Sequence, residues 1–197
     1  MKIYIYGAGG HGKVVYDAMQ KSGLAAEAFI DDADISQWMG LPVIKPKVLY
    51  DVAFLEVHLA VGNCGVREKI SEIFSGVEFL SIYHPQAVIS ASAKVKAGTF
   101  VAANAVIGPD AIVGAHCIIN HNAVVDHDCV VADFCHIAPL VSLGGGVKVG
   151  RGVLVGAGST VLPGLVIGDY AVIGAGAVVT KNIAPGLKVV GSPARTI

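Results

Sequence analysis

A six-residue repeat runs through this sequence from Val88 to about Asn182 and constrains the fold more than any other feature. One aliphatic residue recurs in every hexad, and a small residue usually follows it four positions later. The aliphatic positions are Ile89, Val95, Val101, Ile107, Val113, Ile119, Val125, Val131, Ile137, Leu143, Val149, Val155, Val161, Ile167, Ile173 and Val179. This period predicts a parallel β-helix, because each hexad supplies a short strand and a corner and three hexads close a triangular coil. An amphipathic helix is excluded, since apolar positions at this spacing would spiral around it.

A different pattern fills the residues before the repeat. The expected elements are strands over 2–6, 25–30, 58–61 and 78–82, a helix from the first glycine-rich turn to Gly23, and a second helix over about 65–74. Strands that alternate with helices indicate a parallel sheet. We therefore expect a Rossmann-like α/β domain with a βαβ unit over residues 1–83, followed by an all-β domain, the parallel β-helix, over residues 84–197.

The turn after the first strand, Gly7-Ala8-Gly9-Gly10-His11-Gly12, carries a GxGxxG pattern, and Asp31-Asp32 follows about 20 residues later. This arrangement is typical of nucleotide binding, with a diphosphate at the helix N-terminus. A full dinucleotide fold uses two βαβαβ halves, so the roughly four strands expected here favour a mononucleotide diphosphate over NAD. A tight turn without a ligand is the remaining alternative, and His11 disfavours it because a turn needs no imidazole.

Composition limits the partners and the location. The net charge of −1 provides no basic surface for nucleic acid, and no apolar run approaches the ~20 residues that cross a bilayer. The N-terminal stretch is too short and too soon interrupted by glycine for a signal peptide, so we expect a cytoplasmic protein. Cys117, Cys129 and Cys135 occupy small-residue positions of the repeat and Cys64 a loop. Without CxxC spacing we expect neither disulfides nor a zinc site.

Histidines gather in little more than one coil of the repeat, at His116, His121, His127 and His136. Their different hexad positions spread them around the rod, which disfavours a metal site. For His116 and His121 we expect solvated corners without function. His127 differs because aspartates flank it on both sides. A carboxylate against one imidazole nitrogen raises the basicity of the other, as a general base requires. The sequence leaves the choice between Asp126 and Asp128 open.

Taken together, these motifs resemble the bacterial nucleotide-sugar acetyltransferases of the PglD/NeuD type over essentially the whole chain. The matching segments are Gly7 to Gly12, Asp31-Asp32, Ala60-Val61-Gly62-Asn63, Val125-Asp126-His127-Asp128-Cys129, His136 and Gly191-Ser192-Pro193-Ala194-Arg195. The resemblance implies a left-handed β-helix and a homotrimer with active sites between subunits. It also implies acetyl-CoA as the co-substrate and no metal.

The resemblance further implies roles for individual residues. A UDP-sugar is expected at Gly9, Gly10, His11 and Gly62, with Asp31 and Asp32 near the uridine. The catalytic base and its supporting acid fall on His127 and Asp128. The acetyl end of the thioester is expected at His136, and the rest of acetyl-CoA at Gly145, Ala157 and Ala175, where small side chains leave a groove for pantetheine.

The expected activity is N-acetylation of a UDP-4-amino-4,6-dideoxy-N-acetylhexosamine, giving a diacetamido sugar of the bacillosamine type. His127 would take the amine proton, and a backbone N–H near Gly145 would hold the oxyanion. Two alternatives stay open. One is O-acetylation of a sugar such as sialic acid, which the same base could perform. The other is a non-catalytic nucleotide-sugar-binding protein, which would give no reason for the aspartates beside His127.

Three apolar side chains lie outside the inward column of the repeat, at Phe100, Phe134 and Leu140. An exposed apolar patch usually marks an interface. We therefore expect these residues to form the contact between subunits of the trimer.

Overall fold

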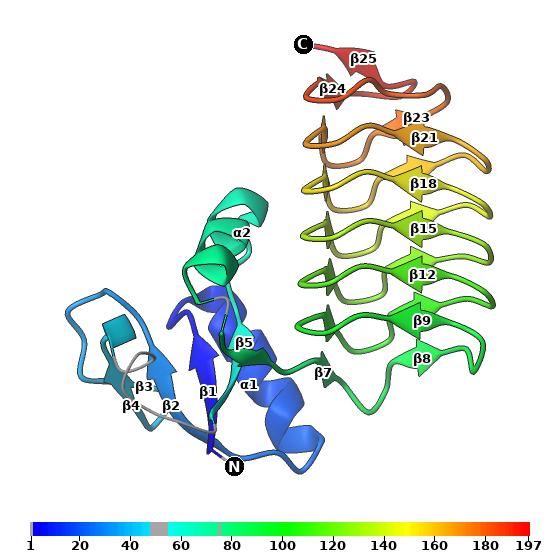
Figure 1. The fold of residues 1–197 in the computed structure, drawn as a ribbon. Coiled ribbons are helices and arrows are strands. Elements are labelled where there is room, and N and C mark those ends of the chain that lie inside the picture. The colour runs from blue at the N-terminus through cyan, green and yellow to red at the C-terminus, as the bar shows by residue number, and fades with distance from the viewer. Residues whose placement is uncertain (1, 48–54, 75) are drawn as a thin grey trace.

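The structure, a computed structural model, describes residues 2–47, 55–74 and 76–197. An α/β domain at the N-terminus lies beside a long rod of stacked coils (Figure 1). The N-terminal sheet has the order β3-β4-β2-β1-β5-β6. Its strands are β1 (Lys2–Tyr6), β2 (Ala26–Ile30), β3 (Gln37–Trp38), β4 (Leu41–Ile44), β5 (Leu55–Leu59) and β6 (Glu78–Phe79).

The sheet is parallel except for β3, which pairs antiparallel with β4. Sequence analysis did not predict this edge hairpin, because its turn uses Met39-Gly40 in place of an Asn-Gly pair; both residues have positive φ, as a tight hairpin turn requires. The strand expected over 58–61 is β5, which begins earlier, at Leu55, and ends at Leu59. The charged Glu56 interrupts the apolar pattern, so the start of the strand was not recognised in the sequence. Of the strand expected over 78–82, only Glu78–Phe79 belongs to the N-terminal sheet, as β6, and the chain then enters the rod.

One helix covers each face of the N-terminal sheet. α1 (Gly10–Lys21) packs Val15 and Met19 on the face that carries Ile5 and Phe29. α2 (Cys64–Ile73) belongs to the core on the opposite face, which includes Tyr4, Tyr6 and Ile30. This division follows from the alternation of side chains along a strand. It leaves the loops after β1 and β5 at the same edge of the sheet.

The rod is a left-handed parallel β-helix, which confirms the fold expected from the hexads and the resemblance. The first face consists of β7 (Ile82–Tyr83), β10 (Phe100–Val101), β13 (Ile118–Ile119), β16 (His136–Ile137), β19 (Leu154–Val155), β22 (Val172–Ile173), β24 (Lys188–Val190) and β25 (Arg195–Thr196). The second face consists of β8 (Val88–Ile89), β11 (Val106–Ile107), β14 (Val124–Val125), β17 (Ser142–Leu143), β20 (Thr160–Val161) and β23 (Val178–Val179). The third face consists of β9 (Lys94–Val95), β12 (Ile112–Val113), β15 (Val130–Val131), β18 (Lys148–Val149) and β21 (Val166–Ile167). Each strand from β8 to β23 has two residues, and the second of them points into the common core.

The turns between faces stack into three corners, held by backbone hydrogen bonds between successive coils. The first corner, between the first and second faces, contains residues 103, 121, 139, 157 and 175. The second corner, between the second and third faces, contains residues 109, 127, 145 and 163. The third corner, which returns the chain to the first face, contains residues 97, 115, 133, 151 and 169.

Glycines at the ends of the rod strands serve close packing between coils. A Cβ at Gly108 would lie 2.8 Å from the backbone nitrogen of His127 in the next coil. A Cβ at Gly114 would lie 2.5 Å from the backbone nitrogen of Asp133. The left-handed corner positions fall elsewhere, for example at Asp128. These glycines are therefore required by the close approach of the next coil and not by a left-handed backbone conformation.

The N-terminal domain covers the lower part of the first face. Phe100 is completely buried in a core that it shares with Ile82 of β7 and Met19 of α1. Phe134 is also buried, stacked on His116 with ring centroids 5.0 Å apart. The prediction that Phe100 and Phe134 form a subunit contact is therefore wrong, because these side chains lie beneath the chain's own first domain. Leu140, the third member of that set, is 65% exposed.

Candidate active site

The second corner carries the histidine that sequence analysis singled out. His127 Nδ1 lies 2.8 Å from Asp128 Oδ2. Asp126 does not reach the ring; its Oδ1 accepts a hydrogen bond of 2.7 Å from the backbone N–H of His127. Of the two aspartates that the sequence left open, Asp128 therefore contacts the imidazole.

The charge around His127 favours its protonated form. The hydrogen bond to Asp128, followed by the charge of Asp126, raises the pKa of His127. With the Asp128 carboxylate accepting at Nδ1, the neutral ring carries its proton there and exposes a lone pair at Nε2. Both side chains are more than half exposed in the single chain. A base with free access to an acceptor amine is the chemistry that this arrangement allows.

Gly145 lies one coil beyond His127 at the same corner. A Cβ at this position would collide with Nε2 and Cε1 of the His127 ring. The absence of a side chain therefore places the imidazole nitrogen directly against backbone. The adjacent Gly146 N–H donates to the His127 carbonyl over 2.9 Å, which holds the two coils in register.

Ala157 and Ala175 lie at the first corner, one coil apart, and both are exposed. The Gly176 N–H donates to the Ala157 carbonyl over 2.8 Å, which stacks the two coils. Their methyl groups leave the backbone of this corner accessible. Within one chain, however, they do not share a corner with Gly145, although the resemblance assigns all three to acetyl-CoA.

The glycine-rich turn divides into glycines that the fold requires and glycines that it does not. Gly7 has φ +116° and a Cβ there would lie 2.6 Å from the Ala60 carbonyl oxygen. Gly12 would place a Cβ against the Gly7 carbonyl oxygen, so it is needed for the close approach of α1 to β1. Nothing lies within 4 Å of a Cβ at Gly9 or Gly10. The open glycines at the start of α1 leave space for a group that approaches the backbone.

Asp31 fastens this turn to the next strand. Its Oδ2 accepts from the Ala8 N–H over 2.7 Å and its Oδ1 from the Ala33 N–H over 2.8 Å. Both carboxylate oxygens therefore bind the chain's own backbone. Asp32 is exposed beside it, and its carbonyl oxygen accepts from Lys45 Nζ over 2.9 Å.

His11 and His136 meet where the two domains touch, with ring centroids 6.4 Å apart. Burial lowers the pKa of His11 to about 3 and that of His136 to about 4. His11 Nε2 is buried and has no hydrogen-bond partner within the described residues. His136 Nδ1 lies 3.2 Å from the carbonyl oxygen of Gly62, which joins the rod to the loop after β5.

The candidate residues thus form separate groups in one chain. Gly9, His11 and Gly62 lie with His136 at the first face of the rod, whereas His127 lies at the second corner. In a triangular prism the corner between the second and third faces is opposite the first face. The rod itself therefore stands between the nucleotide loops and the base of the same molecule.

The structure corrects one expectation about the histidines. His116 is only 8% exposed, and burial lowers its pKa to about 4, so it is not a solvated corner. Phe134 stacks on it from the next coil, and Phe79 packs against it from the N-terminal domain, a contact that the repeat does not reveal. Cys129 is buried and its Sγ lies 3.2 Å from the Gly144 carbonyl oxygen; burial raises the pKa of its thiol, which disfavours a nucleophilic role.

Two further findings concern groups outside this site. Among the described residues no cluster of three or more histidine, cysteine, aspartate or glutamate side chains is arranged to hold a metal ion. Neither helix in the described part of the chain has the length and apolar character needed to span a membrane.

Comparison with known families gives matches to both parts of the chain. Residues 2–74 match the PglD N-terminal domain, and residues 92–127, 128–163 and 146–181 match the bacterial transferase hexapeptide family (six repeats). The two families together span most of the chain.

Solved structures of similar sequence match the whole length of this chain. A perosamine N-acetyltransferase from Caulobacter crescentus, in complex with CoA and GDP-perosamine, is 32% identical with a TM-score of 0.96, covering 100% of this chain and 97% of that one. The acetyltransferase domain of PglB from Neisseria gonorrhoeae, in complex with acetyl coenzyme A, is 34% identical with a TM-score of 0.96, covering 100% and 98%. WeeI from Acinetobacter baumannii is 29% identical with a TM-score of 0.87, covering 100% of both chains.

Proposed function

Because this chain belongs to the family of hexapeptide-repeat sugar N-acetyltransferases with a PglD-type N-terminal domain, we propose that it acetylates the 4-amino group of a UDP-4-amino-4,6-dideoxy-N-acetylhexosamine. Family membership makes the chain an acetyltransferase; the proposal concerns its acceptor, its site residues and its assembly. Acetyl-CoA is the donor, as in the Neisseria relative that binds it. The product is a UDP-diacetamido sugar of the bacillosamine type, made in the cytoplasm for a glycan.

The observation that carries the proposal is the His127–Asp128 pair packed against Gly145. In the proposed reaction the amine lone pair attacks the thioester carbonyl of acetyl-CoA, and the C–S bond breaks as the tetrahedral intermediate collapses. His127 Nε2 accepts the proton that the amine loses, and this proton can return to the departing thiolate. The backbone N–H of Gly145 supports the developing oxyanion in this scheme, because those of Gly144 and Gly146 donate to carbonyl oxygens within the rod.

The nucleotide is proposed to lie at the edge of the N-terminal sheet. Gly9 and Gly10 leave the N-terminus of α1 open to a diphosphate, and Gly62 forms the neighbouring loop. His11 offers its unpartnered Nε2 to the sugar or the diphosphate. Asp31 holds the turn through its backbone contacts, which leaves Asp32 as the acid free to meet the base or the ribose.

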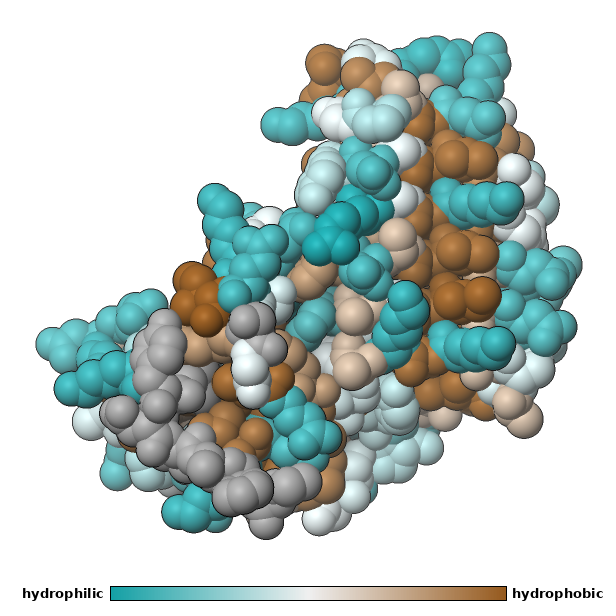
Figure 2. Space-filling model, in the orientation of Figure 1, coloured by the Kyte–Doolittle hydropathy of each residue, from teal (hydrophilic) through white to brown (hydrophobic). Residues whose placement is uncertain are grey.

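A homotrimer completes the proposed site. Within one chain the rod separates His127 from the nucleotide loops, so a nucleotide-bound sugar reaches His127 only on another chain. Exposed apolar side chains line the third face at Ile112, Val130 and Val166. Over these strands Figure 2 shows hydrophobic surface interrupted by hydrophilic side chains. A neighbouring rod packed here would cover this surface and bring Ala157 and Ala175 of one chain towards Gly145 of the next.

Release of the CoA thiol with different acceptors tests the proposal. We expect turnover with the UDP-linked 4-amino sugar and a kcat lower by about 10²- to 10⁴-fold in His127→Ala, the usual loss of a general base, with little change in acetyl-CoA affinity. Preference for a GDP-linked 4-amino sugar would replace the proposed acceptor. Transfer to a hydroxyl sugar in place of the amine would establish O-acetylation. A His127→Ala enzyme at nearly full rate would remove His127 from the mechanism.

A further inference from the structure

Arg67 of α2 is buried between the two domains with 1% of its surface exposed. Its guanidinium donates to five backbone carbonyl oxygens of the described residues. A buried guanidinium is costly unless its donors are satisfied, so this site is built around it. The partners of Arg67 come from two distant segments of the chain.

On one side Arg67 holds the loop that follows β5. Its Nη1 donates to the Val61 carbonyl oxygen over 2.6 Å and to that of Gly62 over 3.3 Å. This is the loop that lies beside the Gly7 turn at the edge of the sheet, where Gly7 approaches Ala60 too closely for any side chain. The loop's position therefore determines one wall of the proposed nucleotide site.

On the other side Arg67 holds two coils of the rod. Its Nε donates to the His116 carbonyl oxygen over 2.7 Å. Its Nη2 donates to the carbonyl oxygens of Phe134 and Cys135 over 2.8 and 3.2 Å. The planar guanidinium thus spans the gap from the nucleotide loop to the first face, and a lysine could not satisfy acceptors in so many directions.

The rod reaches the same Gly62 carbonyl through a second chain of contacts. Asn120 Oδ1 accepts from the His121 backbone N–H over 2.9 Å, which fixes the orientation of its amide. Asn120 Nδ2 then donates to His136 Nε2 over 3.1 Å, so the neutral ring carries its proton at Nδ1. That nitrogen donates to the Gly62 carbonyl oxygen over 3.2 Å.

We propose that Arg67 is a positioning residue that fixes the Val61–Asn63 loop, and hence the bound nucleotide sugar, in register with the rod. Arg67 from α2 and His136 from β16 converge on one carbonyl oxygen, and Asn120 sets the tautomer of His136. Neither Arg67 nor Asn120 contacts the reacting atoms in this scheme. The inference rests on the proposed function only in taking this loop as part of the nucleotide-sugar site.

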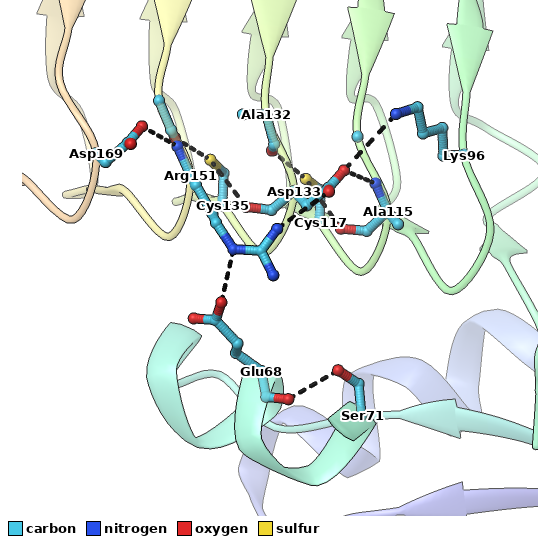
Figure 3. Close-up of polar contacts among 12 residues, drawn as sticks. Glu68, Ser71, Lys96, Ala115, Cys117, Ala132, Asp133, Cys135, Arg151 and Asp169 are labelled. Carbon is cyan, nitrogen blue, oxygen red and sulfur yellow. Dashed lines mark hydrogen bonds and ion pairs between the residues drawn. The ribbon is translucent and has the colours of Figure 1, made fainter. Parts of the chain in front are cut away.

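Glu68, the next residue of α2, supplies a matched control. It also ties the helix to the rod, since its Oε1 accepts from Arg151 Nε over 2.6 Å and from the Tyr170 hydroxyl over 3.2 Å. Figure 3 shows Arg151 between Glu68 and Asp133 at the third corner. Among the contacts described, none of these joins Glu68 to the Val61–Asn63 loop. Glu68→Gln therefore weakens the docking of α2 while leaving the loop contacts intact.

Steady-state kinetics of the full-length enzyme, with each substrate varied, tests the proposal. We expect Arg67→Lys to raise the KM for the nucleotide sugar by about tenfold, the loss that one charge-assisted hydrogen bond represents. We expect kcat at saturation and the KM for acetyl-CoA to stay within about threefold of the wild type, since His127, Gly145, Ala157 and Ala175 lie at other corners of the rod. His136 accepts none of the described Arg67 hydrogen bonds, so its own contact with the loop remains in Arg67→Lys. Glu68→Gln should leave the nucleotide-sugar KM within about twofold. Thermal unfolding of each variant confirms that it is folded.

Asn120→Ala tests the same loop through the contacts made by the rod, because it removes the single hydrogen bond from Asn120 to His136. We expect it to raise the nucleotide-sugar KM in the same direction, by about threefold or more, and it decides the question if Arg67→Lys does not fold. An unchanged nucleotide-sugar KM in a folded Arg67→Lys or in Asn120→Ala overturns the proposal. An equal rise in Glu68→Gln also overturns it, because any loosening of α2 would then suffice. Failure of the wild type to use any nucleotide sugar would instead reject the proposed function.

Discussion

Asp128 shows how a single backbone conformation shapes the site at the residue scale. Its φ of +58° lies in the left-handed region, which aspartate and asparagine tolerate better than most residues. Neighbouring side chains on an extended strand point to opposite faces, so adjacent residues seldom pair. At this left-handed corner the Asp128 carboxylate instead reaches the ring of the preceding residue.

Replacing Asp128 by asparagine tests its effect on the base. Asp128 raises the pKa of His127, and a general base acts in its neutral form, so activity falls below that pKa. In Asp128→Asn the pKa should fall, and the acidic limb of the kcat/KM profile should move to lower pH while the plateau decreases. Asp126→Asn is the comparison: Asp126 bonds to backbone but its charge also raises the pKa of His127, so the limb should move in the same direction by less. A larger shift of the limb in Asp126→Asn would assign the supporting role to Asp126.

The sequence revealed some of these residues and not others, for a physical reason. His127 stood out because its aspartates are adjacent in the chain. Arg67 did not, because its partners are carbonyl oxygens that every residue possesses, up to 68 positions away. Asn120 was equally hidden, and so was the burial of His116, since their contacts form only when successive coils or the two domains pack together.

At the scale of elements, the GxGxxG turn contains glycines that the fold requires and glycines that only a ligand would require, and substitutions can distinguish them. In Gly12→Ala the new Cβ would meet the Gly7 carbonyl oxygen, so the protein should lose stability, by about 1–3 kcal/mol from overpacking. Gly9→Ala places its Cβ in open space at an ordinary φ of −112°, so the melting temperature should hardly change. Calorimetry should nevertheless show that Gly9→Ala binds UDP at least about tenfold more weakly. Wild-type affinity in Gly9→Ala would mean that the diphosphate binds elsewhere.

Buried histidines where α1, β5 and the first face meet should make the fold sensitive to acid. Burial lowers the pKa of His58 to about 4, whereas unfolded histidine titrates near 6.5. Below about pH 6.5 the unfolded state therefore binds more protons, and stability is lost as the pH falls towards 4. At pH 5 this amounts to about 2 kcal/mol for His58 alone.

His58→Asn tests this acid sensitivity. The asparagine Nδ2 can replace the Nδ1 that bonds to the Leu80 carbonyl oxygen over 2.9 Å, and it cannot be protonated in this range. Denaturant unfolding at pH 7 and pH 5 should show a smaller loss of stability in the variant than in the wild type. Equal losses would show that His58 does not contribute to acid sensitivity.

Elements with strong periodicity were predictable, and those without it were not. The hexads gave the β-helix because each one repeats the same inward side chain against the same core. The β3–β4 hairpin lacked such a signal, since its two short strands pair at an edge around Met39-Gly40. The end of the expected strand 78–82 was missed for a related reason: Ile82 pairs with Phe100 of the rod, a partner that local pattern does not reveal.

At the scale of the whole molecule, the base at the second corner and the expected acetyl-CoA groove at the first corner lie apart within one chain. This separation can be tested by complementation between chains. Chains with His127→Ala lack the base, and chains with Ala157→Trp have a blocked groove at the first corner. Both homotrimers should have strongly reduced activity, but mixed trimers should regain partial activity, because some clefts would receive an intact His127 from one chain and an intact groove from the next. Activity and light scattering of purified hybrids measure this. A fully active monomer, or inactive hybrids of confirmed composition, would mean that one chain holds a complete site.

Subunit contacts of the whole molecule were hard to predict from the sequence. Phe100 and Phe134 were taken for a subunit contact because they lie outside the inward column, yet the N-terminal domain buries them. An apolar residue on a repeat surface has the same pattern whether its cover comes from its own chain or from another. Ile112 and Val130 became candidates only when the third face proved to be uncovered in the single chain.

The reversal of the chain at β25 has a consequence for the rod as a polymer. Each coil of a parallel β-helix offers the next one the same row of unpaired N–H and C=O groups, so an open last coil could template the growth of a fibre from further molecules. β25 pairs antiparallel with β24 through Val189–Thr196 and Val190–Arg195, so it turns the polarity of the first face at its end. A molecule that stacked on it in the direction of the rod would meet a strand running the wrong way. The β24–β25 hairpin thus disfavours the continued parallel stacking of coils on that face.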